Sequence, residues 1–307
     1  MTEDTQRTRI LSTSEGLNRE AFSVMDWALF VSISLIWGSS FLLMAIGLDA
    51  FAPGLVTLLR VGLGAAALWL VPQARSRKIE RQDWPRVVVL SVVWIAVPLT
   101  LFPLAQQYIN SAVAGMLNGA TPIFTAIIAV VLLGRMPRFV TIAGLGVGLV
   151  GVVFISAPSI SEGSSEAIGA LLVVIATVCY GLSINIAAPI QQRYGSIPLM
   201  ARVLGLATLW VSPFGFLALP DSTFAWDSLL ASVVVGVLGT GAAFVIFGNL
   251  VGRVGGTRAS FITYVIPVVA LILGVVFRDD VVAPIAIVGV VLVIIGAVLA
   301  SRRDTSR

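Results

Sequence analysis

Ten stretches of mostly apolar residues, joined by short connections, constrain this chain more than any other feature of its sequence. A helix needs about 20 apolar residues to cross a bilayer, and each stretch is close to that length. The chain is 58% hydrophobic and 11% charged, whereas soluble proteins carry about 25% charged residues. We therefore predict an all-α integral membrane protein. Its ten transmembrane helices are expected at residues 27–47, 54–72, 86–105, 112–133, 139–157, 167–189, 199–219, 228–251, 257–277 and 284–301.

The basic residues predict how these helices are oriented, because Lys and Arg concentrate in cytoplasmic loops. If the helices alternate from a cytoplasmic amino terminus, 16 of the 19 basic residues lie on the cytoplasmic side. Arg278 then lies outside, and Arg60 and Arg202 lie within helices. We predict that both termini are cytoplasmic, with a disordered tail over residues 1–26 and a second tail over 302–307.

The second half of the chain repeats the first. An offset of 143 residues aligns Trp37-Gly38-Ser39-Ser40 with Tyr180-Gly181-Leu182-Ser183, and an offset of 145 aligns four further pairs. Matches at a fixed offset favour a duplication over chance resemblance between apolar helices. The predicted units are two five-helix repeats, 27–157 and 167–301. Five is odd, so the second copy is inverted, and inverted repeats place a substrate site at their interface near the bilayer midplane. The four pairs are Phe102 with Phe247, Pro122 with Pro267, Gly144 with Gly289, and Gly151 with Gly296.

The ordered motifs of the first copy resemble those of a known transporter family. They are Ile36-Trp37-Gly38-Ser39-Ser40-Phe41, Pro53, Leu59-Arg60, Ala112, Ala114, Pro122, Leu132-Leu133-Gly134-Arg135 and the glycines from Gly144 to Gly151. This set resembles the EamA-type transporters of the drug/metabolite transporter superfamily. The resemblance implies a ten-helix carrier of the cell inner membrane, usually an exporter of amino acids or related metabolites, with a central cavity. The family commonly has Gly-Glu after helices 4 and 9, where this chain has Gly134-Arg135 and Arg278-Asp279, so a role for that pair is not carried over.

The residue inventory argues against catalysis. The chain has no histidine and one cysteine, Cys179, and all 15 acidic residues fall in predicted tails or loops. A membrane-embedded hydrolase needs a metal, a pair of acids or an activated nucleophile. We therefore expect no catalytic site, no cofactor and no metal site. The run Gly146-x-Gly148-x-x-Gly151 has the form of a dinucleotide fingerprint, but it lies in an apolar helix, which favours helix packing.

The expected function is secondary transport of small metabolites, namely export of amino acids or related zwitterions by alternating access. The alternative is a membrane-embedded scaffold, or an enzyme without a recognisable catalytic site. Without an embedded acid or histidine, transport is expected to be facilitated or exchange-type, or coupled through a loop carboxylate such as Asp49. The expected partners are a small-molecule substrate and the lipid bilayer, with no nucleic acid, and the oligomeric state is left open between a monomer and a homodimer.

The candidate site consists of polar and aromatic residues within the predicted helices. Polar groups in lipid need partners, so any one of them can join helices instead of lining a cavity. Pro122 and Pro267 are each expected to free a backbone carbonyl near these residues. Arg60 and Arg202 occupy equivalent positions and either bind a substrate carboxylate or pin helix ends structurally. The predicted substrate-binding residues are Trp37, Ser40, Asn118, Thr121, Tyr180, Ser183, Thr263 and Tyr264.

Overall fold

The computed structural model describes residues 23–133, 139–162, 164–254, 259 and 262–300, and all regular structure in these residues is helical. The predicted tail 302–307 and most of the tail 1–26 lie outside them, as do Gly134 and Arg135. The first described helix begins at Val24. The helices are α2 (Val24–Leu48), α3 (Pro53–Leu70), η1 (Pro72–Arg75), η2 (Arg81–Asp83), α4 (Trp84–Leu90), η3 (Ser91–Ala96), α5 (Val97–Ala105), α6 (Ser111–Asn118), α7 (Thr121–Leu133), α8 (Phe139–Glu162), α9 (Ser164–Tyr194), α10 (Ser196–Leu217), α11 (Trp226–Gly236), η4 (Val237–Ala242), α12 (Ala243–Val254), α14 (Ile262–Arg278) and α15 (Pro284–Ala300).

Eight helical segments in the described residues are long and apolar enough to cross a membrane, and α14 and α15 provide two shorter apolar helices. Large apolar side chains project from the outer surface of the bundle, among them Leu70, Val131, Phe139 and Leu217. Such faces suit hydrocarbon, because a helix satisfies its own backbone hydrogen bonds. The protein is therefore a multi-pass, all-helical membrane protein, and the predicted fold class is confirmed at this level.

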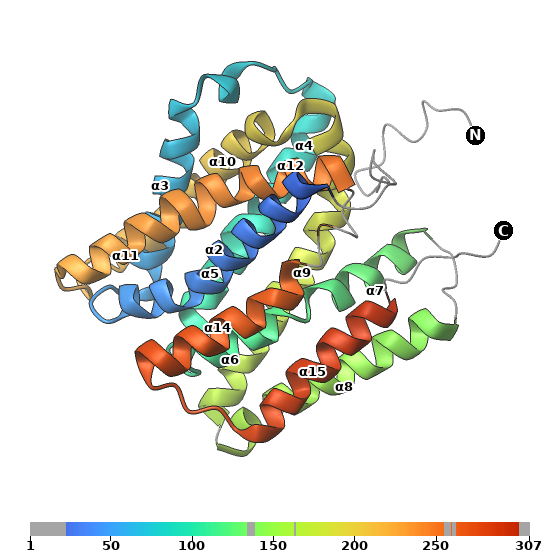
Figure 1. Ribbon diagram of the computed structural model, residues 1–307. Coiled ribbons are helices and arrows are strands. Elements are labelled where there is room, and N and C mark those ends of the chain that lie inside the picture. The colour runs from blue at the N-terminus through green and yellow to red at the C-terminus, as the bar shows by residue number, and fades with distance from the viewer. Residues whose placement is uncertain (1–22, 134–138, 163, 255–258, 260–261, 301–307) are drawn as a thin grey trace.

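The two halves of the chain are interleaved. Helix α2, from the first half, packs mainly against α11, α12 and α14 of the second half. Helix α9, from the second half, packs mainly against α5, α6 and α7 of the first. Figure 1 shows α2 lying between α14 and the α11–α12 pair. Since α2 and α9 carry the aligned residues Trp37 and Tyr180, both halves contribute to the centre of the bundle.

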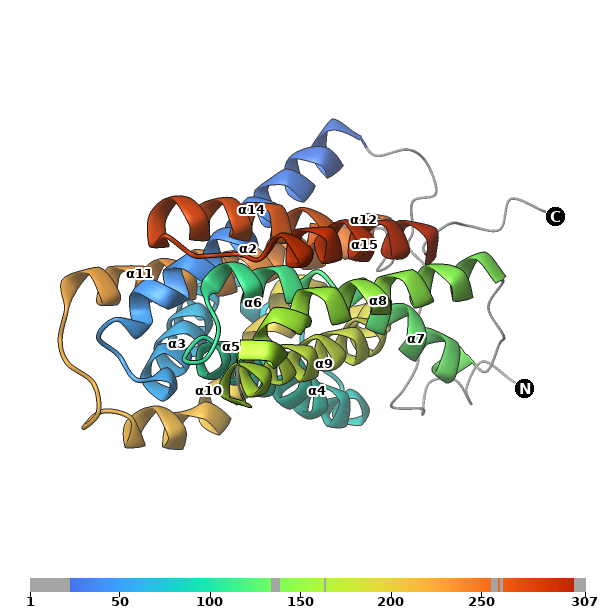
Figure 2. The same cartoon turned by 90° about the horizontal axis from the view of Figure 1, so that it is seen from below.

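Helices α8 and α15 pack against each other through glycines, and they lie side by side in both views (Figures 1 and 2). A Cβ atom added at Gly296 would lie 2.4 Å from the backbone nitrogen of Gly148, and one added at Gly151 would lie 2.6 Å from the carbonyl of Gly289. Glycine is needed at these positions because only hydrogen fits between the two backbones. Gly148 and Gly151 thus serve helix packing, as predicted for this run, whereas a Cβ atom at Gly146 would meet nothing within 4 Å.

Two helices contain π-helical segments that the sequence analysis did not anticipate. Segment η3 interrupts the helix from Trp84 to Ala105, and segment η4 interrupts the helix from Trp226 to Val254. They start at residues 91 and 237, so they occupy nearly equivalent positions in the two halves. A π-helical turn widens the backbone and often occurs at functional sites.

The two prolines at equivalent positions have different effects on the backbone. Before Pro122 the chain leaves the helix at Gly119 and Ala120, so that α6 and α7 are separate helices. Pro267 lies inside α14, which is helical on both sides of it. The two prolines were expected to act alike, because they align at the repeat offset. Only Pro122 coincides with a helix break.

Candidate functional site

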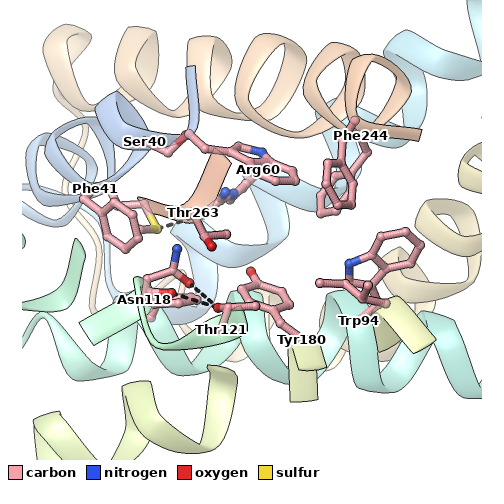
Figure 3. A pocket seen from close by; sticks show the side chains of 14 residues that line it. Ser40, Phe41, Arg60, Trp94, Asn118, Thr121, Tyr180, Phe244 and Thr263 are labelled. Atoms are coloured by element: carbon pink, nitrogen blue, oxygen red, sulfur yellow. Dashed lines mark hydrogen bonds between the residues drawn. The ribbon is translucent and has the colours of Figure 1, made fainter. Parts of the chain in front are cut away.

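A cavity lies at the centre of the bundle, where the two halves meet. Its walls come from α2, α3, η3, α5, the junction of α6 and α7, α9, α12 and α14. Figure 3 shows side chains from several of these helices directed toward one space. The lining is largely aromatic and apolar, with a few hydroxyls, one amide and one guanidinium. The lining residues are Trp37, Ser40, Phe41, Met44, Arg60, Trp94, Phe102, Asn118, Thr121, Tyr180, Ile184, Phe244, Phe247 and Thr263.

Arg60 contributes the positive charge of this lining. The residue is 5% exposed, and its Nε–H donates to Thr240 Oγ1 at 3.0 Å while Nη1 donates to Met44 Sδ at 2.9 Å. A thioether is a weak acceptor. Within the part of the chain that the structure describes, no carboxylate pairs with the guanidinium, and Nη2 has no hydrogen-bond partner. A buried charge held by neutral groups is costly and marks a candidate functional group.

Arg202, its counterpart in the second half, lies outside the cavity. Its Nη1 donates to the carbonyls of Pro198 at 2.7 Å and Ala74 at 2.9 Å, and its Nη2 donates to the carbonyl of Arg77 at 2.9 Å. These bonds tie α10 to the connection between α3 and α4. The structure therefore places Arg202 beside the connection between α3 and α4, and Arg60 in the cavity.

Aromatic rings form much of the cavity wall. Trp37 packs against Phe244 and Phe247 with ring centroids 5.3 Å and 5.0 Å away, and Trp94 lies 5.4 Å from Phe244. Trp37 Nε1 also donates to the carbonyl of Gly239 in η4 at 3.1 Å. This bond fixes the indole toward the interior, so Trp37 is not a lipid-facing residue.

A second aromatic contact lies on the α9 side of the cavity. The rings of Phe102 and Tyr180 are stacked, with centroids 5.9 Å apart. Phe102 comes from the first half of the chain and Tyr180 from the second. Rings of this kind give a solute a flat apolar surface and can also attract a cation through their faces.

The polar part of the lining surrounds the break between α6 and α7. Thr121 Oγ1 donates to the carbonyl of Asn118 at 2.8 Å, which stabilises the turn. No described residue accepts a hydrogen bond from Asn118 Nδ2, although the residue is 6% exposed. Figure 3 shows Asn118, Thr121 and Tyr180 across the space from Arg60, with Thr263 nearby. The helix break thus presents an amide and hydroxyls to the cavity.

The structure brings together seven of the ten predicted site residues: Trp37, Ser40, Arg60, Asn118, Thr121, Tyr180 and Thr263. The remaining three lie elsewhere. The Ser183 hydroxyl donates to the carbonyl of Cys179 within α9 at 2.7 Å, and Tyr264 packs against a hydrophobic cluster beside the cavity. Arg202 lies at the end of the bundle, as described above.

Sequence reasoning missed half of the lining. Most of these residues are apolar, and an apolar residue in a membrane helix carries no mark that separates a cavity wall from ordinary packing. A usable signal existed for Phe102 and Phe247, which align at the repeat offset and both line the cavity. The missed residues are Phe41, Met44, Trp94, Phe102, Ile184, Phe244 and Phe247.

The described acidic residues lie toward the ends of the helices and do not line the cavity. In the described ranges no group of three or more Cys, Asp or Glu side chains could hold a metal ion. The arrangement can therefore bind a solute through one cation, neutral polar groups and aromatic rings. It offers no pair of groups for acid–base catalysis.

Ion pairs join the two halves at both ends of α2. At the start of the helix, Asp26 is fully buried and pairs with Arg253 at the end of α12. At the other end, Asp49 accepts two hydrogen bonds from Arg278 of α14, at 2.7 and 2.8 Å. Each pair connects a first-half residue to a second-half residue, so a change in the angle between the halves would strain one pair or the other.

A further charged cluster lies near the end of the bundle where α2 starts. Asp83 is 3% exposed and accepts hydrogen bonds from Tyr194 Oη and Arg193 Nη1, both at 2.7 Å. Arg86 Nη1 lies 3.5 Å from the other carboxylate oxygen. Because Asp83 follows the connection that Arg202 holds, these groups secure that connection against α9 and α10.

A multi-pass helical protein with a central cavity lined by aromatic, hydroxyl and amide groups has the architecture of a solute transporter. The profile of the EamA-like transporter family matches residues 26–157 and again 167–302. The chain therefore belongs to the EamA family, in the drug/metabolite transporter superfamily, and is a transporter and not an enzyme.

Named relatives are transporters as well. The chain is 25% identical over 289 residues to a probable terminal-alkyne amino-acid exporter of Streptantibioticus cattleyicolor, covering 92% of this chain and 94% of the relative. It is 25% identical over 250 residues to the uncharacterized transporter YoaV of Bacillus subtilis, covering 80% of this chain and 85% of the relative. A solved crystal structure shares the fold with a TM-score of 0.61 at 20% identity, covering 90% of this chain and 96% of that one.

Proposed function

We propose that this protein exports amino acids or related zwitterions by alternating access around the central cavity. The observation that carries the proposal is the cavity itself, with Arg60 for a carboxylate and with rings and polar groups for the rest of the solute. The relative named as a probable amino-acid exporter supports the same solute class. A phosphate ester fits less well, because Arg202 is bonded to backbone carbonyls and leaves one guanidinium for two negative charges.

In the proposed membrane arrangement, the protein crosses the cell inner membrane ten times, as two inverted five-helix repeats. Both termini then lie in the cytoplasm. The short helices α14 and α15 complete the spans of the second repeat. The distribution of Lys and Arg supports this orientation. Cysteine labelling tests it: with Cys179 replaced, a cysteine at Ser164 should react from outside and one at Arg77 from inside. Labelling of both from the same face would refute it.

In the proposed transport cycle the two repeats rock against each other about the cavity. The pairs Asp26–Arg253 and Asp49–Arg278 are placed to hold opposite ends closed, since each joins the repeats at one end of α2. Opening one end would require its pair to separate while the other stays intact. No carboxylate belongs to the described part of the cavity lining, which supports facilitated or exchange-type transport, or coupling through a loop carboxylate such as Asp49.

Counterflow in proteoliposomes tests the proposed function directly. The panel of solutes consists of amino acids, nucleosides and amines. Vesicles loaded with an unlabelled amino acid should accumulate the labelled form of that amino acid. An imposed pH gradient alone should drive little concentrative uptake. Vesicles with the Trp37→Ala variant serve as the matched control for a damaged cavity. If no labelled amino acid exchanges in vesicles that contain correctly folded protein, the proposed substrate class is rejected.

A further inference from the structure

Among the described residues that line it, the cavity contains a positive charge, that of Arg60, without a matching negative one. From this imbalance we infer that Arg60 makes the carboxylate the required group of the solute and leaves the ammonium dispensable. The inference rests on the proposed function and narrows it. The solute class becomes monocarboxylates with an apolar or aromatic body, with or without an amino group.

The hydrogen bonds that Arg60 makes in this structure leave part of its guanidinium available to a carboxylate. Its guanidinium is held by the Thr240 hydroxyl and the Met44 thioether, both neutral, and Nη2 has no described partner. A carboxylate can accept two parallel hydrogen bonds from a guanidinium, which is stronger than either neutral contact. Displacing the Met44 contact at Nη1 would present Nη1 and Nη2 together to an incoming carboxylate.

An amine has no comparable partner. None of the described lining residues is a carboxylate, so the ammonium of an amine would enter beside an uncompensated guanidinium. The faces of Trp37 and Tyr180 attract cations, but they have to offset the repulsion between two like charges in a poorly solvated space. A carboxylate removes that repulsion by neutralising Arg60, and an ammonium on the same solute then adds little.

The remaining walls favour an apolar or aromatic body. Trp37, Trp94, Phe244 and Phe247 form one connected set of rings, and Phe102 with Tyr180 forms another. These surfaces give apolar contact at any position of the solute that lies away from Arg60. A compound with a charged group at both ends has no second counter-charge in the lining.

Three compounds with the same phenyl ring separate these requirements. L-phenylalanine carries both charged groups, 3-phenylpropionate carries the carboxylate alone, and phenethylamine carries the ammonium alone. Binding to the purified protein can be followed by its tryptophan fluorescence, to which the cavity residues Trp37 and Trp94 contribute, and by ligand-induced thermal stabilisation. We expect 3-phenylpropionate to bind within about threefold of L-phenylalanine, and phenethylamine to bind about tenfold or more weakly, as for the loss of hydrogen bonds to a charged group.

Variants of the two equivalent arginines assign the effect to Arg60. Arg60→Gln should weaken 3-phenylpropionate about tenfold or more and abolish its advantage over phenethylamine. Arg60→Lys should retain part of that advantage, because it keeps the charge but not the planar fork. Arg202→Gln is the matched control and should preserve the order of the three compounds. The measurements on the unaltered protein test the inference even if an Arg60 variant does not fold.

Each outcome is decisive. If phenethylamine binds as tightly as 3-phenylpropionate, if 3-phenylpropionate binds much more weakly than L-phenylalanine, or if neither carboxylate binds, the inference is wrong. If Arg202→Gln changes the order of the compounds while Arg60→Gln does not, the assignment to Arg60 is wrong. If the carboxylates bind as expected but no amino acid exchanges in proteoliposomes, the binding rule stands and the proposed transport function fails.

Discussion

Arg60 and Arg202 occupy equivalent positions in the two repeats, yet their surroundings differ in kind. Arg202 donates three hydrogen bonds to backbone carbonyls of Ala74, Pro198 and Arg77. Arg60 donates to a hydroxyl and a thioether at the cavity wall. The guanidinium of Arg202 is satisfied by the protein, whereas that of Arg60 is left with capacity for a ligand.

The difference shows that duplication preserved the position of the arginine but not its partners. The connection that precedes α4 folds back over α10 and supplies carbonyls to Arg202. Arg60 instead lies against η4, where Thr240 provides one hydroxyl. Two copies of one family domain can therefore place one arginine at a cavity and bond its counterpart to backbone carbonyls at the end of the bundle.

The largest effect is expected at the end of the bundle that Arg202 helps to hold. Asp83→Ala removes a buried carboxylate and leaves Arg193, Arg86 and Tyr194 without it. Breaking a buried charged pair costs about 3–5 kcal/mol, so the variant should unfold at much lower denaturant or temperature. Thermal melting in detergent measures this. An unchanged melting temperature would show that the cluster does not stabilise the connection. Glu80→Gln, at a more exposed partner of Arg193, is the control.

The next effect tests Arg60 directly. Arg60→Gln should lower the affinity for a transported amino acid by about 2–3 kcal/mol, the value of hydrogen bonds to a charged group. Stability should hold or rise, because the variant removes a buried charge that lacks an acidic partner. Substrate titration and thermal melting on the same preparation separate the two quantities. A large loss of stability would instead make Arg60 a structural residue like Arg202.

Arg202→Gln should give the opposite pattern. The variant loses hydrogen bonds to three carbonyls, and the expected loss of stability is about 1–2 kcal/mol. Solute affinity should not change, because the side chain does not line the cavity. The same titration and melting experiments apply. Reduced affinity with unchanged stability would mean that Arg202 contributes to solute binding and not to the stability of the bundle.

A smaller effect is expected at Asn118. Asn118→Ala removes an amide that faces the cavity and has no described acceptor for Nδ2, so affinity should fall by about 1 kcal/mol, as for one hydrogen bond. Ser183→Ala is a matched control, since that hydroxyl is bonded within α9. Competition binding would measure both. Equal losses of affinity in the two variants would mean that the Asn118 amide does not contact the solute directly.

The smallest stability effect is expected at the partly exposed pair Asp49–Arg278. Their side chains are 49% and 33% exposed, and such pairs contribute about 0–1 kcal/mol. Asp49→Asn should therefore hardly change the melting temperature. If the pair holds one end closed, the rate of exchange should change nonetheless. Counterflow rates with Arg278→Gln as the reciprocal variant provide the check. Unchanged rates in both variants would remove this pair from the proposed cycle.

Much of the fold could be predicted from the sequence because the bilayer leaves few choices. The predicted segment 27–47 corresponds to α2 at Val24–Leu48, and 284–301 corresponds to α15 at Pro284–Ala300. Backbone groups in lipid must bond within a helix, so apolar length translates into helix length. The π-helical segments were not predictable in this way, because apolar length does not distinguish a π-helical turn from an α-helical one.

The candidate site was predictable only where polarity marked it. Asn118, Thr121 and Arg60 stand out in apolar helices, and all three line the cavity. Ser183 stands out equally but bonds to its own helix, and no local pattern distinguishes the two cases. Phe244 does not stand out at all, since rings in apolar helices serve packing and cavity walls alike.

The sequence by itself determined that this chain is a helical membrane protein with a duplicated plan, because apolar length and residue offsets are linear properties. Only the tertiary structure decided that Arg60 faces the cavity and Arg202 does not. That outcome depends on which distant segments lie beside each arginine: η4 beside the first, and the connection before α4 beside the second. A charge is defined by its residue, but whether it is satisfied depends on neighbours that packing brings together.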